Sequence, residues 1–179
     1  RLLVAEQGGT LWMVKNGVRL PTPVWSRPQE VLDNGDRGLL GVAVDPNFYV
    51  NHYIYLLYTV DPDSNGVASE EVSFSRLTRY QMNASGDTNT VDLSTRTILM
   101  GHDWRHGPLS ATLSHTIGTV TFGSDGSLLV SVGDGASFDV VDEADSIRRA
   151  SDPRAPIPTR TSVRSARRTS RACAARSCA

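Results

Sequence analysis

The chain has 179 residues, of which 39% are apolar and 21% are charged, and 18 basic residues against 19 acidic ones give a formal charge of −1. This length fits one domain or a piece of a larger one, and the apolar fraction excludes a wholly disordered chain. The sequence has no run of about 18 apolar residues, which excludes a membrane-spanning helix.

Short apolar runs separated by turn signals recur along the chain. They predict antiparallel strand pairs over residues 2–14, 40–59 and 117–133, because Gly, Asn, Asp and Pro cluster between the paired runs. Residues 74–80 alternate apolar and polar side chains, which predicts a half-exposed strand. No amphipathic helix is predicted before residue 140.

An apolar run, an Asp/Gly turn, a second apolar run and a longer polar stretch are typical of a β-propeller blade. A propeller closes with about four to eight blades, and the repeated strand pairs of the body supply two to three. The sequence therefore predicts an all-β fold, in which residues 1–152 form an incomplete propeller with an open sheet edge.

The last part of the chain, residues 153–179, differs sharply in composition. Residues 1–147 hold nine basic and 18 acidic groups, a net of −9, whereas residues 148–179 hold nine Arg and one acid, a net of +8. The tail has almost no large apolar groups, so we expect it to lack a folded core. A shifted reading frame in GC-rich DNA, a plain disordered tail and an arginine-rich nucleic-acid arm all fit. The lack of stacking aromatics speaks against the nucleic-acid arm.

Two polar loops suggest metal ligands. Residues 61–66 (DPDSNG) begin like a calcium loop, but Val72 stands where an EF-hand needs Glu, so an acidic inter-strand loop is the better interpretation. His102, Asp103 and His106 lie close together in sequence, and loop polarity explains them equally well. We assign no metal ligand.

Several segments resemble known signatures. Residues 35–48 (GDRGLLGVAVDPNF) resemble the first signature of the pyrroloquinoline quinone (PQQ)-dependent sugar dehydrogenases, a family that includes soluble glucose, aldose and sorbosone dehydrogenases. Residues 115–118 (HTIG), 122–126 (FGSDG) and 132–135 (VGDG) are similar to its second signature. Residues 4–9 (VAEQGG) resemble its opening strand.

The resemblance implies a six-bladed propeller that oxidises an aldose or sorbosone-type sugar, with PQQ and calcium as cofactors and an external electron acceptor. The calcium ligands would lie outside this chain, which we expect to be inactive alone. The family is usually exported, which implies a periplasmic or secreted protein. Since the chain begins with Arg1 rather than Met, any signal peptide would lie upstream. The alternative is a non-enzymatic propeller that binds a carbohydrate or a protein partner.

The candidate catalytic residues flank one predicted hairpin. His115 precedes its first strand and Asp134 follows its second, and a hairpin returns both ends to one edge of the sheet. An imidazole suits removal of a hydroxyl proton, and a carboxylate can fix its tautomer. Without the resemblance, a strand-end His is more often a surface residue; the resemblance implies a base and its orienting acid.

The resemblance also implies a set of cofactor-binding positions. Asp36 stands where family members often have Gln or Glu, and Ser114 stands where they commonly have an acid. With the neighbouring Arg37, these residues are the candidates for contacts with the cofactor.

Overall fold

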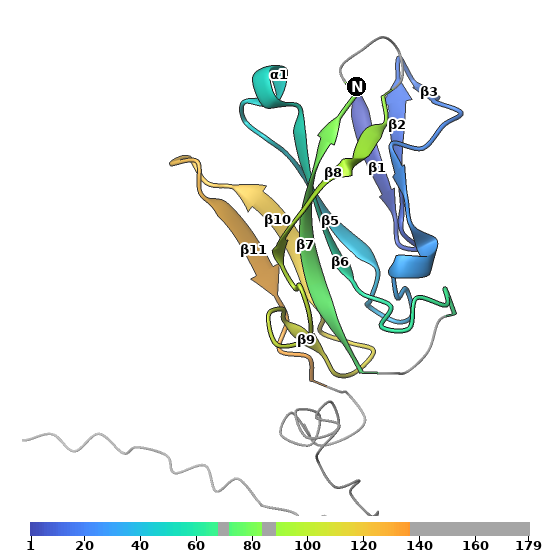
Figure 1. Cartoon of the computed structure of the whole chain (residues 1–179), viewed down its shortest axis with the longest axis vertical. Coiled ribbons are helices and arrows are strands. Elements are labelled where there is room, and N and C mark those ends of the chain that lie inside the picture. The colour runs from blue at the N-terminus through green and yellow to red at the C-terminus, as the bar shows by residue number, and fades with distance from the viewer. Residues whose placement is uncertain (68–71, 84–88, 137–179) are drawn as a thin grey trace, which may run out of the picture.

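The computed structural model describes residues 1–67, 72–83 and 89–136. Nearly all of its regular structure is β-strand, arranged as three antiparallel sheets (Figure 1), so the predicted all-β class is confirmed. The predictions for the tail, residues 153–179, lie outside the described residues.

The first sheet contains the predicted pair over residues 2–14. Its first two strands run antiparallel from Leu2 opposite Val14 to Glu6 opposite Thr10. Two short strands complete it, both on β2. The strands are β1 (Leu2–Glu6), β2 (Thr10–Lys15), β3 (Val18–Arg19) and β4 (Trp25–Ser26).

The second sheet is a four-stranded antiparallel meander that contains the predicted pair over residues 40–59 and the predicted strand over 74–80. A short strand, β9, pairs with β7 beyond the end of β8. The strands are β5 (Leu39–Val44), β6 (Tyr53–Thr59), β7 (Ser73–Met82), β8 (Val91–Met100) and β9 (Leu109–Ser110).

The edge strand β8 was not predicted from the sequence. Its residues lack a clean period of two, and its pairing with β7 shifts register twice. Because an edge strand is half solvated, it tolerates polar residues and irregular pairing. Its place in the sheet comes from β7, which supplies the partner backbone.

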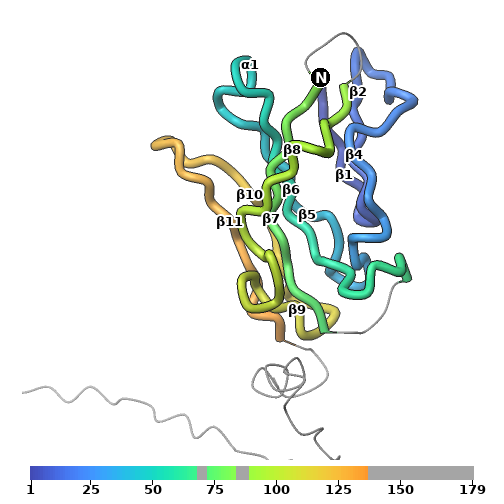
Figure 2. Tube along the Cα trace, viewed as in Figure 1, coloured from blue at the N-terminus to red at the C-terminus, as the bar shows by residue number. Residues whose placement is uncertain are grey.

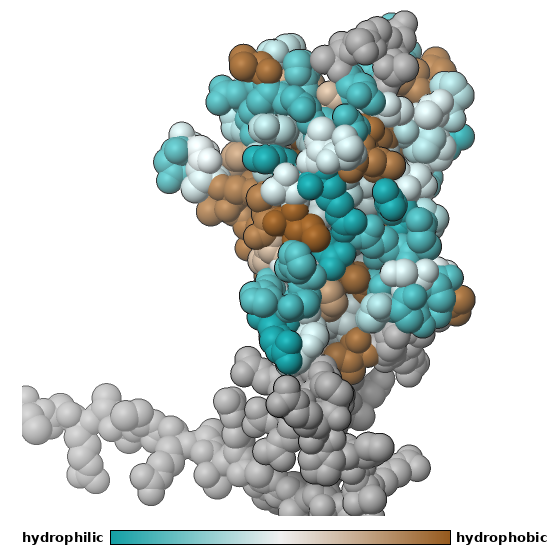
Figure 3. Space-filling view, in the orientation of Figure 1, coloured by the Kyte–Doolittle hydropathy of each residue, from teal (hydrophilic) through white to brown (hydrophobic). Residues whose placement is uncertain are grey.

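The third sheet is the predicted pair over residues 117–133, made of β10 (Ile117–Phe122) and β11 (Leu128–Val132). Within the described part of the chain, β11 has no second partner strand. Its side chains Leu129 and Val132 are about half exposed, at 53% and 48%. Figure 3 shows apolar residues gathered on this side of the molecule. Among the described residues, the sheet edge is therefore open after this pair.

Two short helical turns complete the fold, η1 (Pro28–Glu30) and α1 (Phe48–Asn51). The sequence predicted only a turn before α1, because four residues carry no helical period. The carbonyl and carboxylate of Asp45 accept the amides of Phe48 and Asn47, which starts the helix.

The central strand β6 explains how the sheets pack. Ile54, Leu56 and Tyr58 point into a core shared with the first sheet, while Tyr55 and Leu57 point into a core shared with β10. Alternate side chains of a strand face opposite sides, so a strand covered on both faces is apolar throughout. The second sheet therefore lies between the first and the third, with one face packed against each (Figure 2).

Candidate functional site

The two predicted catalytic residues meet at the open end of the β10–β11 hairpin. β10 starts and β11 ends at the same end of the molecule (Figure 1), and His115 and Asp134 lie two residues outside these strand ends. The imidazole Nδ1 of His115 lies 2.9 Å from Oδ1 of Asp134. The hairpin thus brings together two side chains that are 19 residues apart.

The electrostatics of this pair fix the position of its proton. The backbone N–H of Ala136, 3.1 Å away, and the imidazole of His115 hold the pKa of Asp134 below its usual range. An ionised carboxylate can only accept hydrogen bonds. The proton of the shared bond therefore sits on Nδ1 of His115. Both side chains reach solvent, with 41% of His115 and 73% of Asp134 exposed.

The backbone at His115 is unusual and is held on both sides. Its φ of 53° lies in the left-handed region, which residues with a Cβ rarely occupy. Its N–H donates to Oδ2 of Asp36 at 3.2 Å, and its carbonyl accepts the N–H of Gly135 at 2.8 Å. These bonds join three segments of the chain at one residue.

Two glycines allow these segments to approach so closely. A Cβ at Gly133 would lie 2.1 Å from the carbonyl oxygen of His115. A Cβ at Gly35, which has a φ of 62°, would lie 2.4 Å from the carbonyl oxygen of Leu113. Only a residue without a side chain fits at either position.

Arg37, predicted to bind the cofactor, is fully buried. Its Nε donates to Oγ of Ser110 at 3.0 Å and to the carbonyl of Thr112 at 3.2 Å, and its Nη2 donates to the carbonyl of Ser110 at 2.9 Å. The guanidinium therefore holds the segment that leads to His115. This structural use was not expected from the sequence, since a lone Arg in a Gly-rich turn gives no sign of burial.

The other two predicted cofactor-binding residues also contact the chain itself. Ser114 donates its hydroxyl to the carbonyl of Ala136 at 2.9 Å. Asp36 accepts the amide of His115, as described above. Sequence reasoning missed Gln7, whose Nε2 donates to the carbonyls of Gly35 and Arg37 at 2.8 and 2.7 Å. Gln7 lies in a segment that matches the family, but nothing local marks its side chain.

A shallow depression of about 490 Å³ opens beside His115. Asp36 and His115 supply its charged and titratable groups, and the sheet supplies an apolar wall. Its lining includes Asp36, Leu40, His115, Ile117, Ser131 and Val132.

Both loops considered for metals contain internal side-chain hydrogen bonds. The carboxylate of Asp61 accepts the amides of Ser64 and Gly66 at 3.1 and 2.8 Å. His106 pairs with Asp103 at 2.7 Å between Nδ1 and Oδ1. Among the residues that the structure describes, no group of three His, Cys, Asp or Glu side chains could hold a metal ion.

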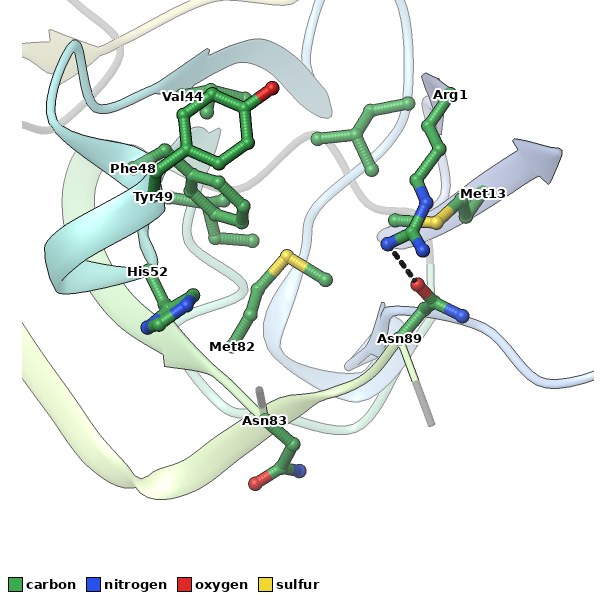
Figure 4. A pocket seen from close by; sticks show the side chains of 11 residues that line it. Arg1, Met13, Val44, Phe48, Tyr49, His52, Met82, Asn83 and Asn89 are labelled. Carbon is green, nitrogen blue, oxygen red and sulfur yellow. Dashed lines mark hydrogen bonds between the residues drawn. The ribbon is translucent and has the colours of Figure 1, made fainter. Parts of the chain in front are cut away.

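A larger hollow of about 620 Å³ lies at the opposite end of the molecule, beside α1 and the N-terminus (Figure 4). Phe48, Met13 and Met82 line it, and Arg1 closes one side by donating to Oδ1 of Asn89 at 2.8 Å. It contains none of the predicted site residues.

Comparison with solved structures identifies the fold. Two solved glucose dehydrogenases, at 19% and 20% identity, superpose with TM-scores of 0.56 and 0.57. The soluble aldose sugar dehydrogenase from Escherichia coli, in its apo form, does so at 20% identity with a TM-score of 0.51. Each match covers 75% of this chain but only 35% of the solved protein, so the chain spans about a third of their length.

The fold is therefore part of a β-propeller of the sugar dehydrogenase type. Residues 1–151 match the family described as glucose/sorbosone dehydrogenase, and the chain belongs to that family. This confirms the resemblance seen in the sequence. No helix in the described part is long and apolar enough to cross a membrane.

Proposed function

We propose that the whole protein oxidises a hydroxyl group of an aldose or sorbosone-type sugar, with His115 as the general base. The observation that carries this proposal is the hydrogen bond between His115 and the ionised Asp134 at the mouth of a depression. Family membership supplies the reaction class. No observation favours a non-enzymatic binding role.

The pair suits removal of a proton from a sugar hydroxyl. With the Nδ1 proton directed at Asp134, Nε2 is the nitrogen that would accept the hydroxyl proton. The imidazolium formed would then be stabilised by the carboxylate beside it. A positioned base of this kind contributes roughly 10²–10⁴-fold to a rate.

The family resemblance implies PQQ, which when bound would accept the hydride from the sugar carbon. The described residues fit the proton-transfer half of this site. They do not fit the carboxylates of the quinone, because Asp36 and Asp134 are acidic and Arg37 is turned inward. An external electron acceptor, calcium and export to the periplasm or medium are proposed on the resemblance alone.

The test is dye-linked oxidation of aldoses, with added PQQ and calcium, by the longest polypeptide that the source organism expresses from this gene. We expect His115→Gln to lower kcat by about 10²–10⁴-fold. Asp134→Asn should also lower it, because the amide can present its N–H to Nδ1 and favour the wrong tautomer. His102→Gln, on another loop, is the matched control. Unchanged turnover in His115→Gln would refute the assignment.

A further inference from the structure

The turn at residues 34–37 forms several hydrogen bonds with the segment that carries His115. The amide of Asp36 donates to the carbonyl of Leu113 at 2.7 Å, and its own carbonyl accepts the Thr116 hydroxyl at 2.8 Å. Its Oδ2 accepts the His115 amide at 3.2 Å. One residue thus makes three contacts to a segment about 80 positions away.

His115 needs such contacts because its backbone is strained. A non-glycine residue in the left-handed region is energetically unfavourable and persists only where neighbouring contacts hold it there. The bond from Gly135 fixes the carbonyl side of His115, and the bond to Asp36 fixes its amide side. If the amide side were released, rotation about φ would carry the imidazole away from Asp134.

Asp36 is itself held in place. Gln7 donates to the carbonyls on both sides of it, and Arg37 anchors the next residue of the turn to Ser110. Gly35 lets the turn come within contact of Leu113. The carboxylate is therefore presented from a rigid support.

We propose that Asp36 is a positioning residue, whose carboxylate holds the backbone of His115 in the left-handed conformation that directs its Nδ1 at Asp134. This inference rests on the proposed function, in which His115 is the base. It gives Asp36 a role that needs no cofactor, in contrast to the contact predicted from the sequence.

The experiment reads the tautomer of His115 rather than activity. Nitrogen-15 NMR, recorded at alkaline pH, distinguishes Nδ1–H from Nε2–H in a neutral imidazole. We expect the wild-type chain to show Nδ1–H, and Asp36→Ala to lose it. Amide exchange at His115 should become roughly tenfold faster in this variant, while amides of β5 and β6 keep their protection.

The conservative variant Asp36→Asn keeps an oxygen that can accept the amide, so it should retain both the tautomer and the slow exchange. Asp33→Ala is the matched control, because within the described residues Asp33 makes no hydrogen bond to the His115 segment. If Asp36→Ala does not fold, Asp36→Ser replaces it, because the shorter serine side chain does not bring its hydroxyl to the amide of His115.

The outcomes separate the two proposals. A wild-type chain without the Nδ1–H tautomer would overturn the oriented base and therefore the proposed function. A wild-type chain with it, and a folded Asp36→Ala or Asp36→Ser that keeps it, would overturn the positioning role alone. Loss of the tautomer in folded Asp36→Asn would also overturn that role, because the accepting oxygen remains.

Discussion

Replacing Glu30 by Gln should destabilise the chain more than any change of similar size on its surface. One oxygen of this carboxylate, Oε1, accepts the Tyr58 hydroxyl at 2.7 Å and Nη1 of Arg76 at 2.9 Å, and it also contacts Nη2 of Arg96. These partners come from β6, β7 and β8, and Glu30 itself comes from η1. The cluster therefore ties four elements together through one negative charge.

The size of the effect follows from burial. Glu30 and Arg76 are 13% exposed and Arg96 is 26% exposed, so the two guanidinium groups would be left near each other with little water. Removing one partner of a buried ion pair costs about 3–5 kcal/mol. Because Arg96 keeps some contact with solvent, we expect a loss near the lower end, about 3 kcal/mol.

Urea denaturation followed by tryptophan fluorescence measures this loss. At a slope of about 2 kcal/mol per molar urea, the midpoint should fall by about 1.5 M. Glu6→Gln, at an exposed site, should stay within about 0.5 kcal/mol of wild type. Adding Arg96→Met to Glu30→Gln should recover at least about 1 kcal/mol, because it removes one stranded charge. A shift in Glu30→Gln no larger than the control's would refute the reasoning.

Three further results are expected. Burial and the hydrogen bond to Asp45 raise the pKa of Tyr55 to about 12. The neutral hydroxyl therefore stabilises the fold fully below the ordinary tyrosine pKa of about 10, and this stabilisation is lost as pH rises to 12. In urea denaturation, Tyr55→Phe should remove about 2–3 kcal/mol of that alkaline loss of stability. Gly133→Ala should lower stability by about 1–3 kcal/mol and abolish the Nδ1–H signal of His115, and a variant with wild-type melting and signal would contradict the close approach. This chain by itself, given PQQ and calcium, should not reduce dye with glucose, and turnover that depends on His115 would show this expectation to be wrong.

The fold could be predicted where local pattern and burial agree. β6 is covered on both faces, so its unbroken apolar run was a sufficient signal, and the turn residues marked the other pairs. β8 and the short strands β3, β4 and β9 were missed, because two-residue strands carry no period and an edge strand takes its pairing from its neighbour. The same applies to α1, which spans a single turn.

The candidate site divides in the same way. The hairpin order indicated that His115 and Asp134 can meet, since paired strands return their ends to one edge, and the family resemblance singled them out as a pair. The sequence could not show that Asp36 accepts the amide of His115, nor that Arg37 is buried against Ser110, because these contacts join residues more than 70 positions apart.

Sequence by itself determined the strand pairs, the family and the chemical types of the site residues, because these depend on local periodicity and on motifs. Tertiary structure decided which polar side chains line the depression, such as His115, and which are buried and hold neighbouring segments, such as Arg37. The reason is physical: a carboxylate or guanidinium acts on whatever group packing places within about 3 Å of it, and that distance is set by the contact between sheets.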